Sequence, residues 1–183
     1  MLDAGTCLLR PLERGDFATT LAWHRDRDLR NAVLGYPFPV TEEGEAQWYE
    51  QALADQSRRA ATFAICADGD HAALGLVRLS GIDWIVRSAE FSIVIGNAAS
   101  RGKGIGRAAT ERLIAYGFDD LNLNRIYLRV TAENLAAIKL YEGLGFQQEG
   151  VCRQHAFVDG ALVDIVMMAL LREEWSSRPK GRA

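Results

Sequence analysis

The sequence predicts a protein of the α/β (α+β) class, a single domain in which helices cover both faces of a mixed β-sheet. Three observations lead to this prediction. The chain has 183 residues, the length of one domain. Its content of 49% hydrophobic and 25% charged residues is ordinary for a globular protein with a sizeable core. The spacing of its apolar residues switches repeatedly between the period of a strand and that of a helix, in the order of a strand meander followed by a β-α-β unit.

The first third of the chain predicts one short strand and two helices. Pro11 limits the apolar segment Thr6–Arg10 to an edge strand. Asp16 suits the N-cap of a helix that covers Phe17 to about Arg25. After a loop that contains glycine and two prolines, a second helix is expected to begin at Thr41.

The remaining two thirds alternate between strands and helices. Three consecutive strands are expected over Ala61–Ala67, Leu74–Trp84 and Ser88–Ile95, the first two joined by a hairpin turn at Asp68-Gly69-Asp70. The elements expected after them are a helix over Gly104–Phe118, a strand over Arg125–Val130, a helix over Asn134–Leu144, a short strand over Phe146–Glu149 and, after a polar loop, a last strand over Leu162–Leu170. The total is a seven-stranded sheet with about four helices. The domain is expected to span residues 5–175, followed by a flexible tail over 176–183.

Composition excludes several classes of protein. The longest uninterrupted apolar stretch, Ile165–Leu171, is far shorter than the roughly 20 residues of a membrane span. The first residues lack the basic lead and apolar core of a secretory signal. The three cysteines have no metal-ligand spacing and indicate reduced thiols, so a cytoplasmic protein without a metal is expected. A net charge of −3 argues against a nucleic-acid partner.

A glycine-rich turn between a strand and a helix is the feature that carries most functional information. Four glycines fall within eleven residues there, namely Gly96, Gly102, Gly104 and Gly106. Glycines allow positive φ angles and a close approach of the backbone to a ligand. The free N–H groups and the dipole of the following helix favour a phosphate.

Three basic residues surround the same helix start. Arg101, Lys103 and Arg107 place positive charge where the helix dipole disfavours it, which indicates that an anion binds there. The plainer interpretation is a tight turn that packs a helix on a sheet. The spacing matches neither of the two common phosphate-binding motifs, the P-loop and the dinucleotide fingerprint.

Two sequence blocks resemble the GNAT superfamily of N-acetyltransferases. Arg101-x-x-Gly104-x-Gly106 resembles the family's [RQ]-x-x-G-x-[GA] signature. The segment from Asn134 to Phe146 resembles the family pattern N-x-x-A-[IV]-x-[LF]-Y-x-x-x-G-F at every named position. The close resemblance covers roughly residues 74–170. It implies a mostly antiparallel sheet whose fourth and fifth strands splay apart, and acetyl-CoA as cosubstrate.

The resemblance also implies which residues hold the coenzyme. Backbone amides of the glycine-rich turn would bind the pyrophosphate, and the strand before it would offer backbone groups to the pantetheine. Asn134 would anchor the pantetheine or the neighbouring loop, and it also suits a helix N-cap. The full set of implied coenzyme-binding residues is Ile93, Val94, Ile95, Arg101, Gly102, Lys103, Gly104, Ile105, Gly106, Arg107 and Asn134.

Two residues are candidates for the chemistry of acetyl transfer, which needs a neutral amine and a proton for the departing thiolate. The family tyrosine at the position of Tyr141 protonates the thiolate, and without the resemblance Tyr141 would be interpreted as a core aromatic residue. Glu90 is the candidate base, acting directly or through water, because a carboxylate on a central strand needs a partner or has a raised pKa. The alternative for Glu90 is an exposed or ion-paired strand residue.

The acceptor expected from the sequence is a primary amine of a small molecule or of a protein N-terminus, acetylated by direct attack in a ternary complex. The closest branch of the family contains polyamine, ribosomal-protein N-terminal and amino-sugar acetyltransferases. A polyamine acetyltransferase is the specific alternative, although segment 33–40 has no carboxylate to hold a polycation. A catalytically silent coenzyme-binding or sensor module is the other alternative, and a homodimer is left open.

Overall fold

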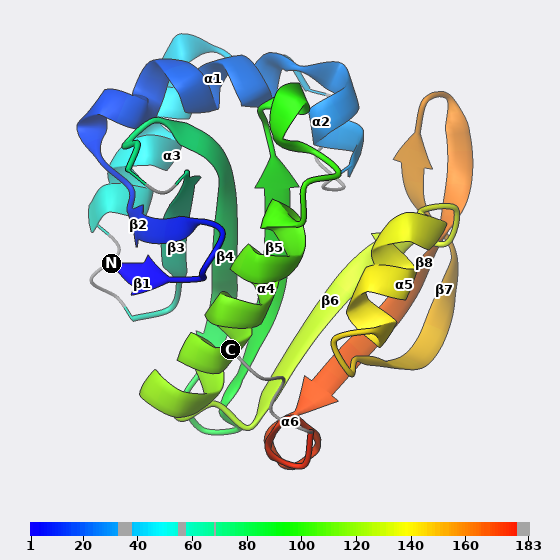
Figure 1. The fold of residues 1–183 in the computed structure, drawn as a ribbon. Coiled ribbons are helices and arrows are strands. Elements are labelled where there is room, and N and C mark those ends of the chain that lie inside the picture. Colours follow the sequence, from blue (N-terminus) through cyan, green and yellow to red (C-terminus); the bar gives the residue numbers. More distant parts are fainter. Residues whose placement is uncertain (33–37, 55–57, 68, 179–183) are drawn as a thin grey trace.

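A single eight-stranded sheet carries all other elements of the computed structural model, which describes residues 1–32, 38–54, 58–67 and 69–178 (Figure 1). The strands are β1 (Leu2–Asp3), β2 (Leu8–Pro11), β3 (Ala61–Cys66), β4 (Ala73–Asp83), β5 (Ser88–Ile95), β6 (Arg125–Thr131), β7 (Gln147–Val158) and β8 (Ala161–Leu171). Their order across the sheet is β1-β2-β3-β4-β5-β6-β8-β7. Every neighbouring pair is antiparallel except β5 and β6.

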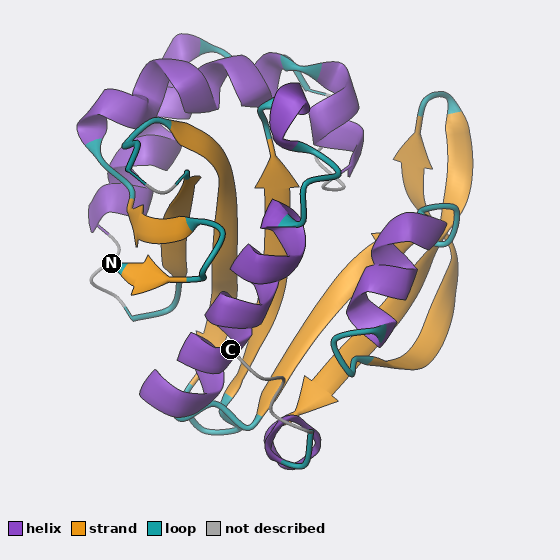
Figure 2. Ribbon diagram, viewed as in Figure 1, coloured by secondary structure: helices purple, strands orange, loops and turns teal. Residues whose placement is uncertain are grey.

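Helices lie on both faces of the sheet, as Figure 2 shows. The α-helices of the described residues are α1 (Phe17–Arg25), α2 (Arg27–Ala32), α3 (Glu42–Ala54), α4 (Ile105–Ala115), α5 (Leu135–Glu142) and α6 (Arg172–Ser176). The 3-10 turns η1 (Arg14–Asp16) and η2 (Ala98–Ser100) precede α1 and α4, and a π-helical turn, η3 (Tyr116–Asp120), follows α4.

Each face of the sheet has its own apolar cluster, because strand side chains alternate between the faces. The larger cluster joins α4 and α5 to the sheet through buried residues such as Leu113 and Tyr141. The smaller one joins α1 and α3 to the other face through Tyr49, Ala64 and Leu76. The predicted fold class, a mixed and mostly antiparallel sheet with helices on both faces, is confirmed.

The predicted splay of the fourth and fifth strands corresponds to β5 and β6. These two strands pair at three positions, Ser88 with Arg125, Ala89 with Ile126 and Glu90 with Tyr127. Beyond Glu90, β5 keeps its antiparallel partner β4 as far as Ile95, and β6 keeps β8 as far as Thr131. The two strands therefore diverge from a short paired segment and open a gap in the middle of the sheet (Figure 1).

Several element boundaries differ from the sequence prediction. The sheet has eight strands instead of seven, because Leu2–Asp3 adds a two-residue edge strand. The helix α2 was not predicted, since six residues are too few to show a helical period. The helix expected over Gly104–Phe118 begins one residue later and its last turn is π-helical.

The largest difference is β7, predicted to end at Glu149 and in fact running to Val158. A register shift between Cys152 and Ala156 interrupts the alternation, so its second half resembles a polar loop in the sequence. The β7–β8 hairpin turns at Asp159-Gly160, where both residues have positive φ, which is the turn that Asp-Gly favours.

Parts of some predicted segments lie outside the described residues. They include Asp68 of the predicted β3–β4 turn and residues 179–183 of the expected tail. Ser176 ends α6, and Arg178 lies over the ring of Trp175 at 4.5 Å and forms an ion pair with Glu111 at 3.5 Å. The flexibility of the tail stays a prediction.

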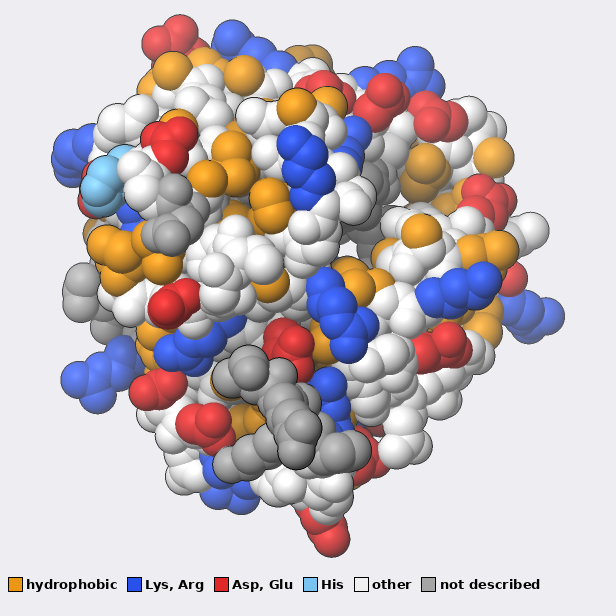
Figure 3. Space-filling model, in the orientation of Figure 1, with side chains coloured by type: hydrophobic (Ala, Val, Ile, Leu, Met, Phe, Trp, Pro, Cys, Tyr) orange, Lys and Arg blue, Asp and Glu red, His pale blue; other side chains and the backbone are white. Residues whose placement is uncertain are grey.

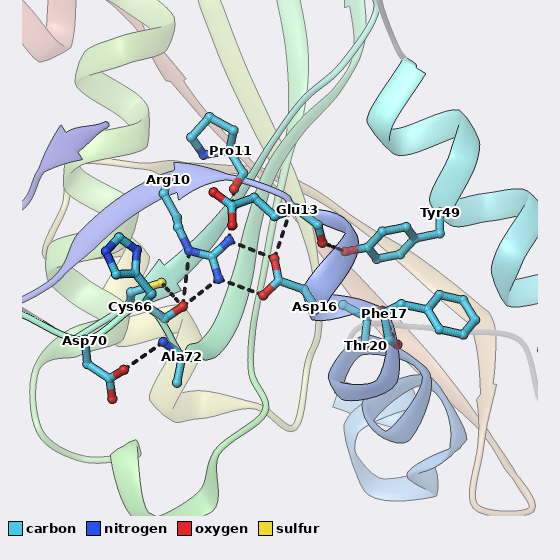
Figure 4. Close-up of polar contacts among 11 residues, drawn as sticks. Arg10, Pro11, Glu13, Asp16, Phe17, Thr20, Tyr49, Cys66, Asp70 and Ala72 are labelled. Atoms are coloured by element: carbon cyan, nitrogen blue, oxygen red, sulfur yellow. Dashed lines mark hydrogen bonds and ion pairs between the residues drawn. The ribbon is translucent and has the colours of Figure 1, made fainter.

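A buried ion pair fixes the first helix against the sheet (Figure 4). Arg10 of β2 donates two hydrogen bonds of 2.7 Å to the carboxylate of Asp16, and both residues are almost completely buried. Arg10 also donates to the carbonyl of His71. Asp16 accepts from the N–H of Glu13, whose carbonyl accepts the hydroxyl of Tyr49 on α3. The network thus joins β2, η1 and α3.

Candidate active site

The gap between β5 and β6 is a cleft of about 70 Å³. Its described lining comes from β5, β6 and α5: Glu90, Phe91, Ser92, Ile93, Leu128, Arg129, Val130, Asn134, Ala137 and Tyr141. Alternation along β5 directs Phe91 to the face that carries α4 and α5, where it is buried in the larger core cluster. Glu90 therefore points to the opposite face. The cleft connects the two faces of the sheet.

Tyr141 lies on the α5 side of the cleft, 8% exposed. Its ring packs edge-on against Phe91 and Phe146, with ring centroids 6.1 and 5.8 Å away. Burial raises the pKa of Tyr141 to about 12, because the phenolate would lose its hydration. The hydroxyl therefore stays protonated throughout the neutral range and is available as a proton donor.

The start of α5 explains why Tyr141 faces the cleft. Asn134 is the N-cap of this helix, and its side chain accepts a hydrogen bond of 3.1 Å from the N–H of Ala137. Tyr141 follows Asn134 by seven residues, about two turns, so both lie on one side of the helix. Asn134 is thus the N-cap that the sequence suggested, and it also lines the cleft; its contact with the coenzyme stays a prediction.

Glu90 is ion-paired across the cleft. Its Oε1 accepts a hydrogen bond of 2.7 Å from Nε of Arg129 on β6. The side chains of Glu90 and Arg129 are 25% and 43% exposed, so solvent reaches both. The ion-paired alternative for Glu90 is therefore realised at the same place where the candidate base was expected.

The glycine-rich turn continues from the end of β5 into α4. Gly102 and Gly104 have φ angles of +73° and +81°, the left-handed region that favours glycine, and Gly104 is the N-cap of α4. Arg101 donates from Nε to the carbonyl of Ile95 at 3.1 Å. Arg107 donates from Nη2 to the carbonyl of Gly143 at 3.2 Å, which joins the start of α4 to the end of α5.

The predicted site residues thus form one continuous region. Glu90, Ile93, Asn134 and Tyr141 line the cleft. The turn with its basic residues lies at the end of β5, on the face that carries α4 and α5. In Figure 3 this face shows Lys and Arg side chains between the positions of α4 and α5.

Arg129 is a site residue that the sequence interpretation missed. The alternation of Arg125–Thr131 places it on the face of β6 opposite to the buried Ile126 and Leu128. An arginine in the middle of a central strand was a signal that a charged partner lies nearby. The partner itself depends on how β5 and β6 pair, which the local sequence does not show.

Cys152 and His155 belong to strand β7, and neither is among the described residues that line the cleft. Among the residues that the structure describes, no group of three or more His, Cys, Asp or Glu could hold a metal ion. No helix of the described segments is long and apolar enough to cross a membrane.

Comparisons with known proteins agree with this geometry. A family model described as an acetyltransferase (GNAT) domain matches residues 7–147. Spermidine N(1)-acetyltransferase of Vibrio cholerae is 34% identical over 170 residues, which cover 93% of this chain and 95% of that protein. The enzyme of the same name from Escherichia coli K12 is 34% identical, with 98% and 94% covered. The crystal structure of spermidine N-acetyltransferase from Vibrio cholerae with CoA and spermine has a TM-score of 0.85 at 31% identity and covers 94% of this chain and 99% of that chain.

Proposed function

The chain belongs to the GNAT family of acetyltransferases and is an acetyl-CoA-dependent N-acetyltransferase, and we propose that the cleft between β5 and β6 is its active site. The observation that carries this proposal is the meeting of Tyr141 and Glu90 at one cleft from opposite faces of the sheet. A proton donor for the sulfur and a proton acceptor for the amine thus lie on two sides of one cleft. The acetyl group would be transferred from sulfur to nitrogen between them.

This arrangement supports direct attack in a ternary complex. The acceptor ammonium gives one proton to Glu90, or to water beside it, and the neutral amine attacks the thioester carbonyl. The N–C bond forms and the C–S bond breaks, and the sulfur takes the proton of Tyr141. The second proton of the amine restores Tyr141, so one proton is released to solvent for each amide formed. No covalent intermediate with the enzyme is needed.

The coenzyme would bind along β5 and the glycine-rich turn. Beyond Glu90, the edge of β5 that faces the cleft is not paired with β6, so backbone groups of residues 93–95 can pair with the amides of pantetheine. The backbone N–H groups from Arg101 to Arg107 lie at the start of α4, where helix dipole and basic side chains favour the pyrophosphate. Acetyl-CoA supplies the activated acetyl group.

We propose as acceptor a primary amine of a small molecule or of a protein N-terminus. Spermidine is the acceptor named for the relatives, which supports a polyamine as the first specific alternative. Segment 33–40 has no carboxylate, and its residues 33–37 lie outside the described structure.

We also propose a cytoplasmic enzyme, supported by three free cysteines. A homodimer stays a prediction.

Release of free CoA thiol tests the proposed function. The purified chain is incubated with acetyl-CoA and a panel of polyamines, amino sugars, amino acids and N-terminal peptides. Thiol release that depends on one class of amine supports the proposal, and Tyr141→Phe should slow it. Binding of CoA without release for any amine would instead support the coenzyme-binding module.

A further inference from the structure

The backbone carbonyls of β5 alternate between its two neighbouring strands, and this alternation shows which of them face the cleft. The carbonyl of Arg87, just before β5, accepts a hydrogen bond of 3.1 Å from the N–H of Arg125 on β6. The carbonyl of Glu90 accepts from Oγ of Ser80 on β4 at 3.4 Å. Carbonyls two residues apart along a strand point to the same side. The carbonyl of Ile95, eight residues after Arg87, therefore points to the β6 side, where β5 and β6 no longer pair beyond Glu90.

At Ile95 this open edge is engaged by a side chain. Nε of Arg101 donates a hydrogen bond of 3.1 Å to the carbonyl of Ile95. The N–H of Arg101 is engaged as well, because it donates to the carbonyl of Ala98 at 3.2 Å. Arg101 is thus bonded both to the end of the strand and to the 3-10 turn η2. The groups of this edge that pantetheine would meet are the N–H and carbonyl of Ile93 and the N–H of Ile95.

A second set of donors follows Arg101 at the start of α4. The first hydrogen bond of this helix runs from the N–H of Ala108 to the carbonyl of Gly104. The N–H groups of residues 104–107 have no acceptor inside the helix, as in the first turn of any α-helix. They are the groups proposed to bind the pyrophosphate. Arg101 therefore lies between the edge proposed for pantetheine and the donors proposed for the phosphates.

The coenzyme must reach both sets of donors at once. Its pantetheine and its pyrophosphate are covalently joined, so both bind together only if the strand edge and the start of α4 are held at the matching distance. The connection between them, residues 96–103, contains Gly96 and Gly102, and glycine has the largest conformational freedom to lose. A contact that orders this connection before the coenzyme arrives lowers the entropy cost of binding. Arg101 makes such a contact, six residues after the carbonyl that it bonds.

We propose that Arg101 is a positioning residue for the coenzyme: through Ile95, it holds the glycine-rich turn at the distance at which pantetheine and pyrophosphate bind together. The inference rests on the proposed function, since it concerns the coenzyme site of that same cleft. The donor at Nε carries this role. The positive charge of the side chain adds attraction for the phosphates, but it does not set the distance.

Three substitutions separate the donor from the charge. Nε2 of glutamine, Cε of lysine and Cε of methionine occupy the place of Nε along the side chain of arginine. Arg101→Gln therefore keeps a donor there without the charge, Arg101→Lys keeps a charge one atom further on, and Arg101→Met keeps neither. Arg101 is exposed, so none of them opens a gap in the core. The Kd of CoA, measured by calorimetry, should rise by about 3- to 10-fold in Arg101→Met, by less than about twofold in Arg101→Gln, and by more in Arg101→Lys than in Arg101→Gln.

Kinetics distinguish positioning of the coenzyme from a general effect on the fold. With an amine that supports thiol release, Arg101→Met should raise KM for acetyl-CoA together with the Kd of CoA, while kcat at saturating acetyl-CoA stays within about twofold of the wild type. Arg112→Met is the matched control, because it removes an arginine from the last turn of α4, away from the glycine-rich turn. It should bind CoA as the wild type does.

Three results would overturn the inference. Equal losses of CoA affinity in Arg101→Gln and Arg101→Met would assign the effect to charge, an unchanged Kd in Arg101→Met would show that the contact positions nothing, and a fall in kcat at saturating acetyl-CoA would place Arg101 in the chemistry. Failure of the wild type to bind CoA would contradict the proposed function itself. If CoA binds but no amine releases thiol, the order of the Kd values in the variants still decides the inference.

Discussion

The indole of Trp23 on α1 lies directly against the backbone of Gly96, the first residue after β5. A Cβ at Gly96 would fall 2.0 Å from Cε2 of Trp23, closer than any real contact. Glycine at this position is therefore required by packing, and it lets the first helix rest on the end of the strand that leads into the glycine-rich turn.

Gly96→Ala should destabilise the protein by about 1–3 kcal/mol, since the indole must move out of its position. Urea unfolding followed by tryptophan fluorescence measures the change. Gly150→Ala is the control, because a Cβ there meets no atom within 4 Å. Equal stability of the two variants would show that Trp23 does not occupy this position.

Tyr141→Phe should lower kcat by about 10²- to 10⁴-fold, the usual contribution of a proton donor, while the Kd of CoA changes little. Steady-state kinetics and calorimetry separate the two quantities. Tyr116→Phe is the control, since Tyr116 packs against Phe63 and does not line the cleft. An unchanged kcat in Tyr141→Phe would remove the hydroxyl from the chemistry.

The raised pKa of Tyr141 also predicts how stability depends on pH. The folded pKa of about 12 lies above the ordinary value of 10.0, so the stabilisation is complete below pH 10 and is lost as pH rises towards 12. At pH 11 the loss from this group is about 1.4 kcal/mol. Urea unfolding at pH 8 and pH 11 should show a smaller decrease for Tyr141→Phe than for the wild type. Identical decreases would mean that Tyr141 ionises normally.

The left-handed conformation of Gly104 predicts a loss of coenzyme affinity in Gly104→Ala. A Cβ there meets no atom within 4 Å, so the cost is the positive φ of +81° alone, about 1–2 kcal/mol. Because the turn is expected to keep this conformation when CoA binds, the Kd of CoA for the variant should rise by about 5- to 30-fold, which calorimetry can measure. Gly104→Asn should recover part of the affinity, because Asn tolerates this region. Gly15→Ala, at another uncrowded glycine, is expected to bind CoA as the wild type does.

Removing one partner of the buried Arg10–Asp16 pair should cost more than removing both. Burial by itself would raise the pKa of Asp16, but the hydrogen bonds from Arg10 and from the N–H of Glu13 lower it below its ordinary value. Arg10→Met leaves this carboxylate buried without its guanidinium and should destabilise by about 3–5 kcal/mol. The double variant Arg10→Met/Asp16→Leu should recover much of the loss, measured by urea unfolding as a double-mutant cycle. A single variant as stable as the wild type would mean that the pair is not buried in solution.

The same depressed pKa sets the behaviour at acid pH. The stabilisation by Asp16 is present above the ordinary pKa of 3.8 and is lost as pH falls through the lower folded value.

Sequence patterns predicted the parts of this molecule that depend on local spacing. The alternation of β3, β4 and β5 and the cap at Asn134 are such features, and each was placed correctly. Of the four glycines of the turn, Gly102 and Gly104 adopt the positive φ that glycine allows. A resemblance of motifs, and not periodicity, singled out Tyr141.

The missed features depend on pairing between distant segments. Glu90 and Arg129 are 39 residues apart and meet only because β5 and β6 pair in parallel for three residues. The full length of β7 depends on β8, whose hydrogen bonds continue past the bulge at Cys152. Neither partner is visible in a short window of sequence.

The three paired positions of β5 and β6 join the two parts of the sheet beside the cleft. Glu90 belongs to the last of these positions, so its backbone lies between two strand partners, Ser80 of β4 and Tyr127 of β6. Beyond it, β5 continues to Ile95 with β4 as its strand partner. The strand is thus held on both sides where the proton transfer is proposed, and on one side where the coenzyme is proposed to bind.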